Sequence, residues 1–228
     1  MIVYLASPNT QQQAEHAAEM PVLLSYACYS PWLDRYQQSF KRLLIDSGAF
    51  SELTGAAKVD LAAYSDWAER WRGHADAVAG LDDISGDWRR GMSNYAAMPT
   101  GLGFPTIHET DPIEILPELV AIARERGNWI GLGLLPPRSN KERWVRDVCD
   151  RLPEDIHVHG WALREYTHVR RLDSVDSTNW WRDAMAYRKD YPWLTYGECL
   201  DIVVKRYKRW KRVIRDEASE QMELEISA

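Results

Sequence analysis

The sequence predicts an α/β protein with a (β/α)8, TIM-like barrel. Short apolar runs alternate with stretches of helical periodicity, and about eight such units fit within 228 residues. The run Leu43–Ile45 is apolar without alternation, which is typical of a strand buried on both faces of a parallel sheet. A doubly wound open sheet is the alternative. Since the helices between the first and third strands are weak, we expect a distorted barrel, and residues 1–228 are expected to form a single domain.

The strands expected, in chain order, are Ile2–Ala6, Val22–Tyr26, Leu43–Ile45, Ala75–Leu81, Leu102–Ile107, Trp129–Leu135, Ile156–Val158 and Leu172–Val175. The helices expected are Thr10–Met20, Asp60–Trp71, Ile113–Arg126, Lys141–Arg151, a short one at Ala162–Val169 and a long basic C-terminal helix at Leu200–Glu217. Pro31–Phe40 is helical or irregular. An N-cap acid at Asp60 and the pair Asp111–Pro112 mark two of the helix starts, and Gly127 marks an end.

The charge of the chain is uneven. Its formal net charge is −6, so the whole molecule is not a basic nucleic-acid binder. A basic cluster nevertheless lies near the C-terminus, at Lys205, Arg206, Lys208, Arg209, Lys211 and Arg212. It is either a solvated helix face or an edge that contacts phosphates. The chain also has 11 tryptophans, which leaves room for core packing and for flat stacking surfaces.

The cysteines favour a reducing compartment. Cys28, Cys149 and Cys199 are widely spaced and form no CxxC pair, so we expect neither a zinc site nor a disulfide framework, which suits the cytoplasm. The N-terminus has no signal-peptide pattern, and apolar runs fall short of the roughly 20 residues that span a bilayer.

Ionisable residues end most of the later strands. They are Asp46, Asp82, Asp83, His108, Glu109, His159, Asp173 and Asp176. In a barrel, these positions meet at one mouth, which is where such folds place active sites. Each residue alone is open to another interpretation; Asp46, for example, could cap the next segment while Gly48 serves only the turn. Several acids in one pocket favour carboxylate chemistry, with one Asp attacking a sugar carbon and another moving a proton.

Other motifs limit the choice of chemistry. The sequence has no phosphate loop, no GxGxxG fingerprint and no GxSxG elbow, which disfavours nucleotide-triphosphate, dinucleotide and serine-hydrolase chemistry. The glycines in Trp129–Leu135 either let a planar base lie against the backbone or serve close strand packing.

Residues 46–50, Asp-Ser-Gly-Ala-Phe, resemble the Asp-Ser-Gly-Gly-Tyr motif of the tRNA-guanine transglycosylases. Further segments similar to that family follow in its order, at Gly80–Asp83, Thr106–Glu109, Ile130–Gly133, His159–Gly160 and Leu172–Val175. The segment Ser174–Trp180 is closer to the DNA-modifying branch, the phage and bacterial 7-deazaguanine DNA transglycosylases. The zinc subdomain of the tRNA enzymes is absent from this sequence, which favours DNA over tRNA.

The resemblance implies a base-exchange glycosyltransferase without a cofactor or metal, which replaces guanine in DNA by a 7-deazaguanine such as preQ0. Its covalent intermediate would be linked to Asp176 or Asp173. We prefer Asp176, since it lies nearer the loop end and strand alternation turns the two side chains to opposite faces. Asp46 would hold the base and pass protons. The residues implied for base binding are Ser47, Gly48, Phe50, Asp82, Asp83, His108, Gly131, Leu132, His159 and Gly160.

The expected partner is DNA that is single-stranded or has a flipped base, held by the basic cluster, with a 7-deazaguanine as second substrate and no membrane. A homo-oligomer and a partner subunit both remain open. The alternative functions are a hydrolase or transferase of free nucleosides, a tRNA-directed transglycosylase, and a non-catalytic nucleic-acid-binding barrel.

Overall fold

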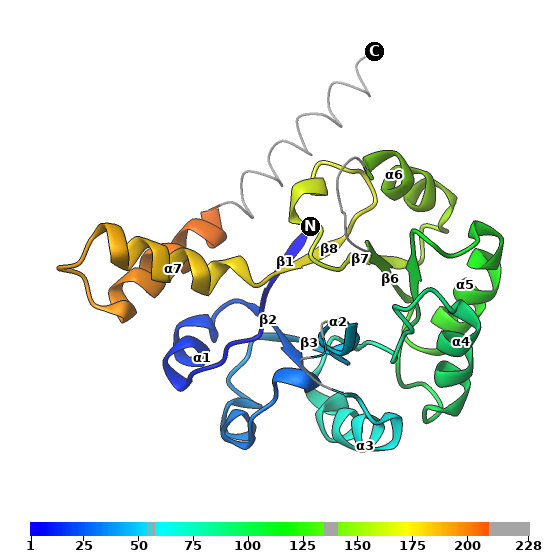
Figure 1. Ribbon diagram of the computed structural model, residues 1–228, viewed down its shortest axis with the longest axis horizontal. Coiled ribbons are helices and arrows are strands. Elements are labelled where there is room, and N and C mark those ends of the chain that lie inside the picture. The colour runs from blue at the N-terminus through cyan, green and yellow to red at the C-terminus, as the bar shows by residue number, and fades with distance from the viewer. Residues whose placement is uncertain (54, 56–57, 135–140, 210–228) are drawn as a thin grey trace, which may run out of the picture.

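The computed structural model describes residues 1–53, 55, 58–134 and 141–209. Eight parallel strands form one curled sheet in the order β4-β3-β2-β1-β8-β7-β6-β5 (Figure 1). The strands are β1 (Ile2–Ala6), β2 (Pro21–Ser25), β3 (Arg42–Asp46), β4 (Ala77–Val78), β5 (Thr106–His108), β6 (Trp129–Gly133), β7 (His157–Gly160) and β8 (Ser174–Ser177). The two end strands meet just beyond β4, where Ala79 and Phe104 form a parallel bridge. This arrangement confirms the predicted α/β barrel.

Five helices lie outside the sheet, in the connections between strands: α1 (Gln11–Ala17), α3 (Leu61–Trp71), α4 (Trp88–Ala97), α5 (Leu116–Glu125) and α6 (Glu142–Arg151) (Figure 1). Helix α2 (Ala49–Leu53) lies at the mouth of the barrel, and α7 (Asn179–Asp190) follows the last strand. Short 3₁₀ segments occur at Tyr26–Cys28, Pro31–Tyr36, Arg72–His74, Ile113–Ile115 and Arg164–Tyr166. Only 3₁₀ turns connect β2 to β3 and β7 to β8, so the barrel departs from a regular alternation of strands and helices.

Three helices were not predicted from the sequence. They are the short α2, then α4, which Asp87 caps by accepting a hydrogen bond from the Arg89 N–H, and α7, which begins directly after β8. Residues 196–209 form a further helix, so the predicted C-terminal helix starts four residues early. Its predicted continuation to 217 lies outside the described residues.

Two strands are shorter than expected. Strand β4 has two residues. Beyond Val78, the chain pairs with the other end of the sheet only through the isolated bridge between Ala79 and Phe104, so no longer ladder forms there. Strand β5 begins at Thr106 because Gly103 has a φ of +83° and Pro105 has no backbone N–H to donate.

The core has two layers. The larger layer packs the helices against the outside of the sheet, and the smaller fills the barrel interior with side chains that include Tyr4, Leu44, Phe104 and Trp129. The interior rings stack in pairs: Phe104 on Trp161, with ring centroids 5.9 Å apart, and Trp129 on His157, at 3.6 Å. These rings fill the barrel below its C-terminal mouth, so polar side chains at the mouth rest on an aromatic floor.

Candidate active site

A cleft of about 920 Å³ opens at the C-terminal ends of the strands. Its lining brings together Asp46 from the end of β3, Asp82 from the loop after β4, His108 from β5 and Asp176 from β8. Trp161, which follows β7, forms part of its floor. Residues separated by 130 positions in the chain therefore share one hollow, as expected for the mouth of a barrel.

Asp46 lies at the last position of β3, in register with Ser25 of β2. Burial raises the pKa of its carboxyl to about 7, against the opposing effect of hydrogen bonds from the Ser25 hydroxyl and the Gly48 N–H; the charges of Asp82 and Asp176 raise the pKa further. A group with this pKa holds and releases a proton near neutral pH, as a general acid and base must.

The turn after Asp46 depends on glycine. Gly48 has a φ of +80°, and a Cβ atom there would collide with the side chain of Ala27 and lie 2.8 Å from the Ser25 hydroxyl oxygen. This backbone turns the Gly48 N–H back to Asp46. Asp46 therefore has both roles considered for it from the sequence. Its carboxylate accepts the hydrogen bond of the turn, and it also lines the cleft.

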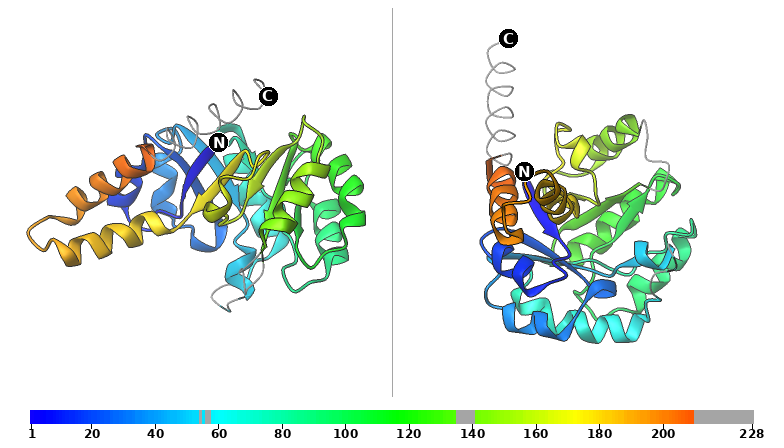
Figure 2. Two further views of the ribbon diagram at one scale, coloured as in Figure 1. Left: turned by 90° about the horizontal axis from the view of Figure 1, so that it is seen from above. Right: turned by 60° about the vertical axis from the view of Figure 1, so that its left-hand side comes forward.

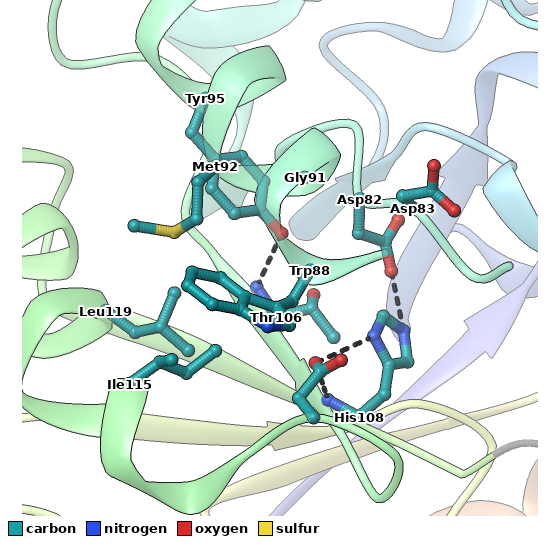
Figure 3. A pocket seen from close by; sticks show the side chains of 11 residues that line it. Asp82, Asp83, Trp88, Gly91, Met92, Tyr95, Thr106, His108, Ile115 and Leu119 are labelled. Atoms are coloured by element: carbon teal, nitrogen blue, oxygen red, sulfur yellow. Dashed lines mark hydrogen bonds and ion pairs between the residues drawn. The ribbon is translucent and has the colours of Figure 1, made fainter. Parts of the chain in front are cut away.

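His108 is held between two carboxylates (Figure 3). Its Nε2 lies 2.9 Å from Oδ2 of Asp82, and its Nδ1 lies 3.4 Å from Oδ2 of Asp111. Burial lowers the pKa of the imidazole, but the hydrogen bonds and charges of the two carboxylates outweigh it and raise this pKa to about 10. His108 is therefore an imidazolium at neutral pH that orients Asp82 at the edge of the cleft. A small cavity of about 10 Å³ lies behind it, beside Trp88 and Tyr95.

Asp176 is 8% exposed, and its Oδ1 accepts a hydrogen bond of 2.7 Å from the backbone N–H of Ala162. The Nε2 atom of the fully buried His159 faces the same oxygen at 3.5 Å. On its other side, His159 bonds through Nδ1 to the Ser174 hydroxyl at 2.8 Å, and this hydroxyl also bonds to His157 at 2.7 Å. A buried row of polar groups thus runs along β7 and β8 and ends at the Asp176 carboxylate.

Asp173 lies at the other end of β8, outside the cleft. Its carboxylate accepts a hydrogen bond of 2.8 Å from the Val158 N–H and lies 3.8 Å from the Arg171 guanidinium. The backbone N–H of Ile2 donates to its carbonyl oxygen. Of the two candidate nucleophiles, Asp176 alone reaches the cleft, so the assignment of Asp173 to the catalytic set is corrected: it ties strand starts together at the base of the barrel.

Six of the residues expected to bind a base do not line the cleft, and Gly131, Leu132 and Gly160 are three of these six. A Cβ on Gly131 would collide with the Trp161 indole and the Thr106 hydroxyl, so this glycine makes room for Trp161 rather than for a base. Leu132 is fully buried in the outer core, because neighbouring positions on a strand face opposite sides. Gly160 packs against Leu163 in that same layer.

The remaining predicted base-binding residues are divided between the cleft and its surroundings. Gly48 and Phe50 line the cleft, and Phe50 is 44% exposed. Ser47 is buried and accepts a hydrogen bond from the Ala49 N–H. Asp83 points away from the cleft, where it accepts from the Ser85 N–H and lies 3.3 Å from Arg90.

Several residues around the cleft were not predicted. Trp161 follows His159 by two positions, and Ser174 precedes Asp176 by two, so the period of a strand would have indicated both. Arg164 and Arg182 join the His108 imidazolium as positive groups in a lining that also holds four carboxyl side chains. Asp111, expected only as a helix cap, is the second carboxylate beside His108.

Lys205, Arg206, Lys208 and Arg209 are exposed on the helix at residues 196–209, while Lys211 and Arg212 lie outside the described residues. Of the described helices, none is long and apolar enough to cross a membrane. In the same part of the chain, no group of three or more His, Cys, Asp or Glu residues is arranged to hold a metal ion.

Fold and site together define an α/β-barrel protein with an acidic, aromatic-floored cleft. No family model and no curated protein matches the chain. A solved structure described as "Structural study of Project ID from Aquifex aeolicus VF5" is similar over 89% of this chain and 90% of that one, with 9% identity and a TM-score of 0.47.

Proposed function

We propose that the protein is a base-exchange glycosyltransferase that removes guanine from DNA and inserts a 7-deazaguanine such as preQ0. The observation that carries the proposal is the meeting of Asp46, Asp82 and Asp176 in one cleft, with the pKa of Asp46 raised to about 7. The cleft volume, about 920 Å³, lies within the range of small-molecule sites and leaves room for a base with its sugar.

In the first half-reaction, an oxygen of the Asp176 carboxylate attacks C1′ of the deoxyribose. The bond from C1′ to N9 of guanine breaks, and its electron pair leaves with the purine. Asp46, protonated below a pH of about 7, donates its proton to a ring nitrogen of the departing base. The products are free guanine and a glycosyl ester of Asp176.

The second half-reaction reverses these roles. The Asp46 carboxylate takes the N9 proton from the incoming 7-deazaguanine, and N9 attacks C1′ and displaces the Asp176 carboxylate. A carboxyl with a pKa near neutral pH serves both steps, since it gives up and regains a proton at little cost. His159 faces Asp176 Oδ1 at 3.5 Å, and the Ala162 N–H donates to that oxygen, so the second carboxylate oxygen is the one assigned to attack.

The base would lie between Asp82 and the rings of the cleft. A carboxylate suits the amidine-like edge of guanine, which carries two N–H donors, and Asp82 keeps one oxygen for this purpose while His108 holds the other. Phe50 lines the cleft and would stack on the purine face. C1′ and N9 of a paired nucleotide are out of reach, so the substrate strand is single or its base is flipped.

The test is transfer of radiolabelled guanine into polymer by the full chain, with single-stranded DNA, duplex DNA and tRNA in parallel reactions. We expect label in DNA with the wild type. We also expect none with Asp176→Asn and wild-type levels with the matched control Asp173→Asn, whose carboxylate lies at the base of the barrel.

Label in none of the polymers, from protein shown to be folded by circular dichroism, would overturn the proposal. Label in tRNA alone would replace DNA by tRNA as the substrate. Release of guanine from free guanosine without any transfer would instead favour the nucleoside hydrolase.

A further inference from the structure

An arm extends from the barrel beside the cleft. It consists of residues 179–209: helix α7, a short turn, and the helix at 196–209 that lies alongside α7 (Figures 1 and 2). Contacts between its two helices include Arg206 with Tyr187 and Tyr207 with Asp183. The start of α7 lines the cleft, at Asn179, so the arm leads from the site to a remote tip.

The exposed large apolar residues gather on this arm. Of the four in the described chain, only Phe50 belongs to the barrel; the others are Met185, Tyr191 and Trp193, exposed by 57%, 38% and 74%. An indole so exposed buries little apolar surface in the fold. Surface rings that cluster, rather than occur singly, mark interaction sites.

The rings at the tip are ordered against one another. Tyr187 and Tyr191, one helical turn apart, stack with centroids 4.4 Å apart, and Trp193 meets Tyr191 edge-on at 5.5 Å. The Arg206 guanidinium lies 4.8 Å above the Tyr187 ring. We call Tyr187, Tyr191 and Trp193 the aromatic tip. Flat rings flanked by a guanidinium are the groups on which unpaired bases stack.

The charge of the arm indicates which partner the aromatic tip fits. Residues 179–209 contain seven basic and four acidic residues, in a chain whose net charge is −6. Arg188 and Lys189 stand next to the tip, where Asp190 is the adjacent acid. An isologous contact with a second copy would bring two positive arms together, which is unfavourable. A polyanion with flat apolar groups satisfies both the charge and the rings.

We propose that the aromatic tip is a stacking site for an unpaired base of a single-stranded nucleic acid. The inference rests on the proposed function only in that the same strand continues into the cleft. Helix α7 has 12 residues and is therefore about 18 Å long. The base on the tip therefore lies several nucleotides along the strand from the one that is exchanged.

The experiment measures binding of a fluorescent single-stranded oligonucleotide of about 20 nucleotides by anisotropy, at several salt concentrations. We expect Trp193→Ala to weaken binding by about 10-fold without changing the salt dependence, because a stacked ring is uncharged. Trp193→Phe should restore most of the affinity. The matched control is Met185→Ala on the same arm, which removes exposed apolar surface without a ring and should bind like the wild type. Duplex DNA should show little effect of Trp193→Ala, since its bases are already stacked.

Equal binding of single strands by Trp193→Ala and the wild type would overturn the inference. The inference would also be overturned if Trp193→Ala left DNA binding unchanged and instead weakened self-association, measured by sedimentation, or binding to anionic vesicles. Exchange of labelled guanine is measured separately. If binding depends on Trp193 but no guanine is exchanged, the stacking site stands and the proposed activity is overturned. If guanine is exchanged but binding does not depend on Trp193, the proposed activity stands and the stacking site is overturned.

Discussion

Asp46 is expected to reduce the stability of the fold at the pH at which it works. Its carboxyl has a pKa of about 7 in the folded protein and an ordinary value of 3.8. Since the folded state binds this proton more tightly than the unfolded state does, stability is lost as the pH rises between these two values. The full difference of roughly three pKa units corresponds to about 4 kcal/mol.

The substitution Asp46→Asn removes this penalty, because an amide stays neutral and its oxygen still accepts the hydrogen bonds from Ser25 and Gly48. From the two pKa values, the variant should exceed the wild type in free energy of unfolding by about 2 kcal/mol at pH 5 and about 4 kcal/mol at pH 8. Base exchange should fall by about 10²-fold to 10⁴-fold, as expected when a general acid and base is removed.

The assay is urea unfolding of both proteins, followed by tryptophan fluorescence between pH 5 and pH 8. Titrating groups other than Asp46 are the same in both proteins, so their contributions cancel in the difference between the two curves. A stability difference that stays constant over this range would refute the reasoning, as would a variant less stable than the wild type at pH 8.

The other predictions concern the two acids of β8 and the two histidines. Asp176→Asn should abolish exchange, with a loss of at least about 10³-fold, while Asp173→Asn should keep it, and initial rates on DNA measure both. His159→Asn should slow exchange by about 10²-fold through misplacement of the Asp176 carboxylate, with little change in KM for DNA; an unchanged kcat would contradict this role. His108→Asn should destabilise the fold most below about pH 6.5 and progressively less toward pH 10, because the raised pKa of this imidazole adds stability only where the group is protonated. Thermal unfolding across that range tests the trend, and a loss that grows with pH would contradict it.

The ends of the strands could be predicted from the sequence. The site residues that lie at those ends could therefore be predicted as well. Asp46 closes the apolar run Leu43–Ile45, Asp176 directly follows the predicted strand Leu172–Val175, and parallel strands in a barrel bring such ends to one mouth. The choice between Asp176 and Asp173 also followed from the alternation of a strand. The position of Asp176 at the cleft is confirmed, whereas the Asp173 carboxylate bonds to the Val158 N–H outside it.

What the sequence could not indicate depends on contacts between strands. Gly131 was expected to face a base, yet its register with Thr106 and the position of Trp161 fill that space. The carboxylate pair around His108 needed the loop after β4 to fold over β5, which no local pattern specifies. Helix α7 begins two residues after β8, and the Ser177 hydroxyl at the end of that strand accepts a hydrogen bond from the Asn179 N–H, so a strand residue takes the place of a regular N-cap.

The central claim is that a carboxylate in this cleft bonds to a sugar carbon. The most direct measurement is mass spectrometry of the wild-type protein incubated with DNA in the absence of an incoming base, followed by peptide mapping of any covalent adduct. The account predicts a deoxyribose-linked peptide modified at Asp176 and no adduct in Asp176→Asn. An adduct at Asp173, or exchange of labelled guanine by the Asp176→Asn variant at the wild-type rate, would contradict it.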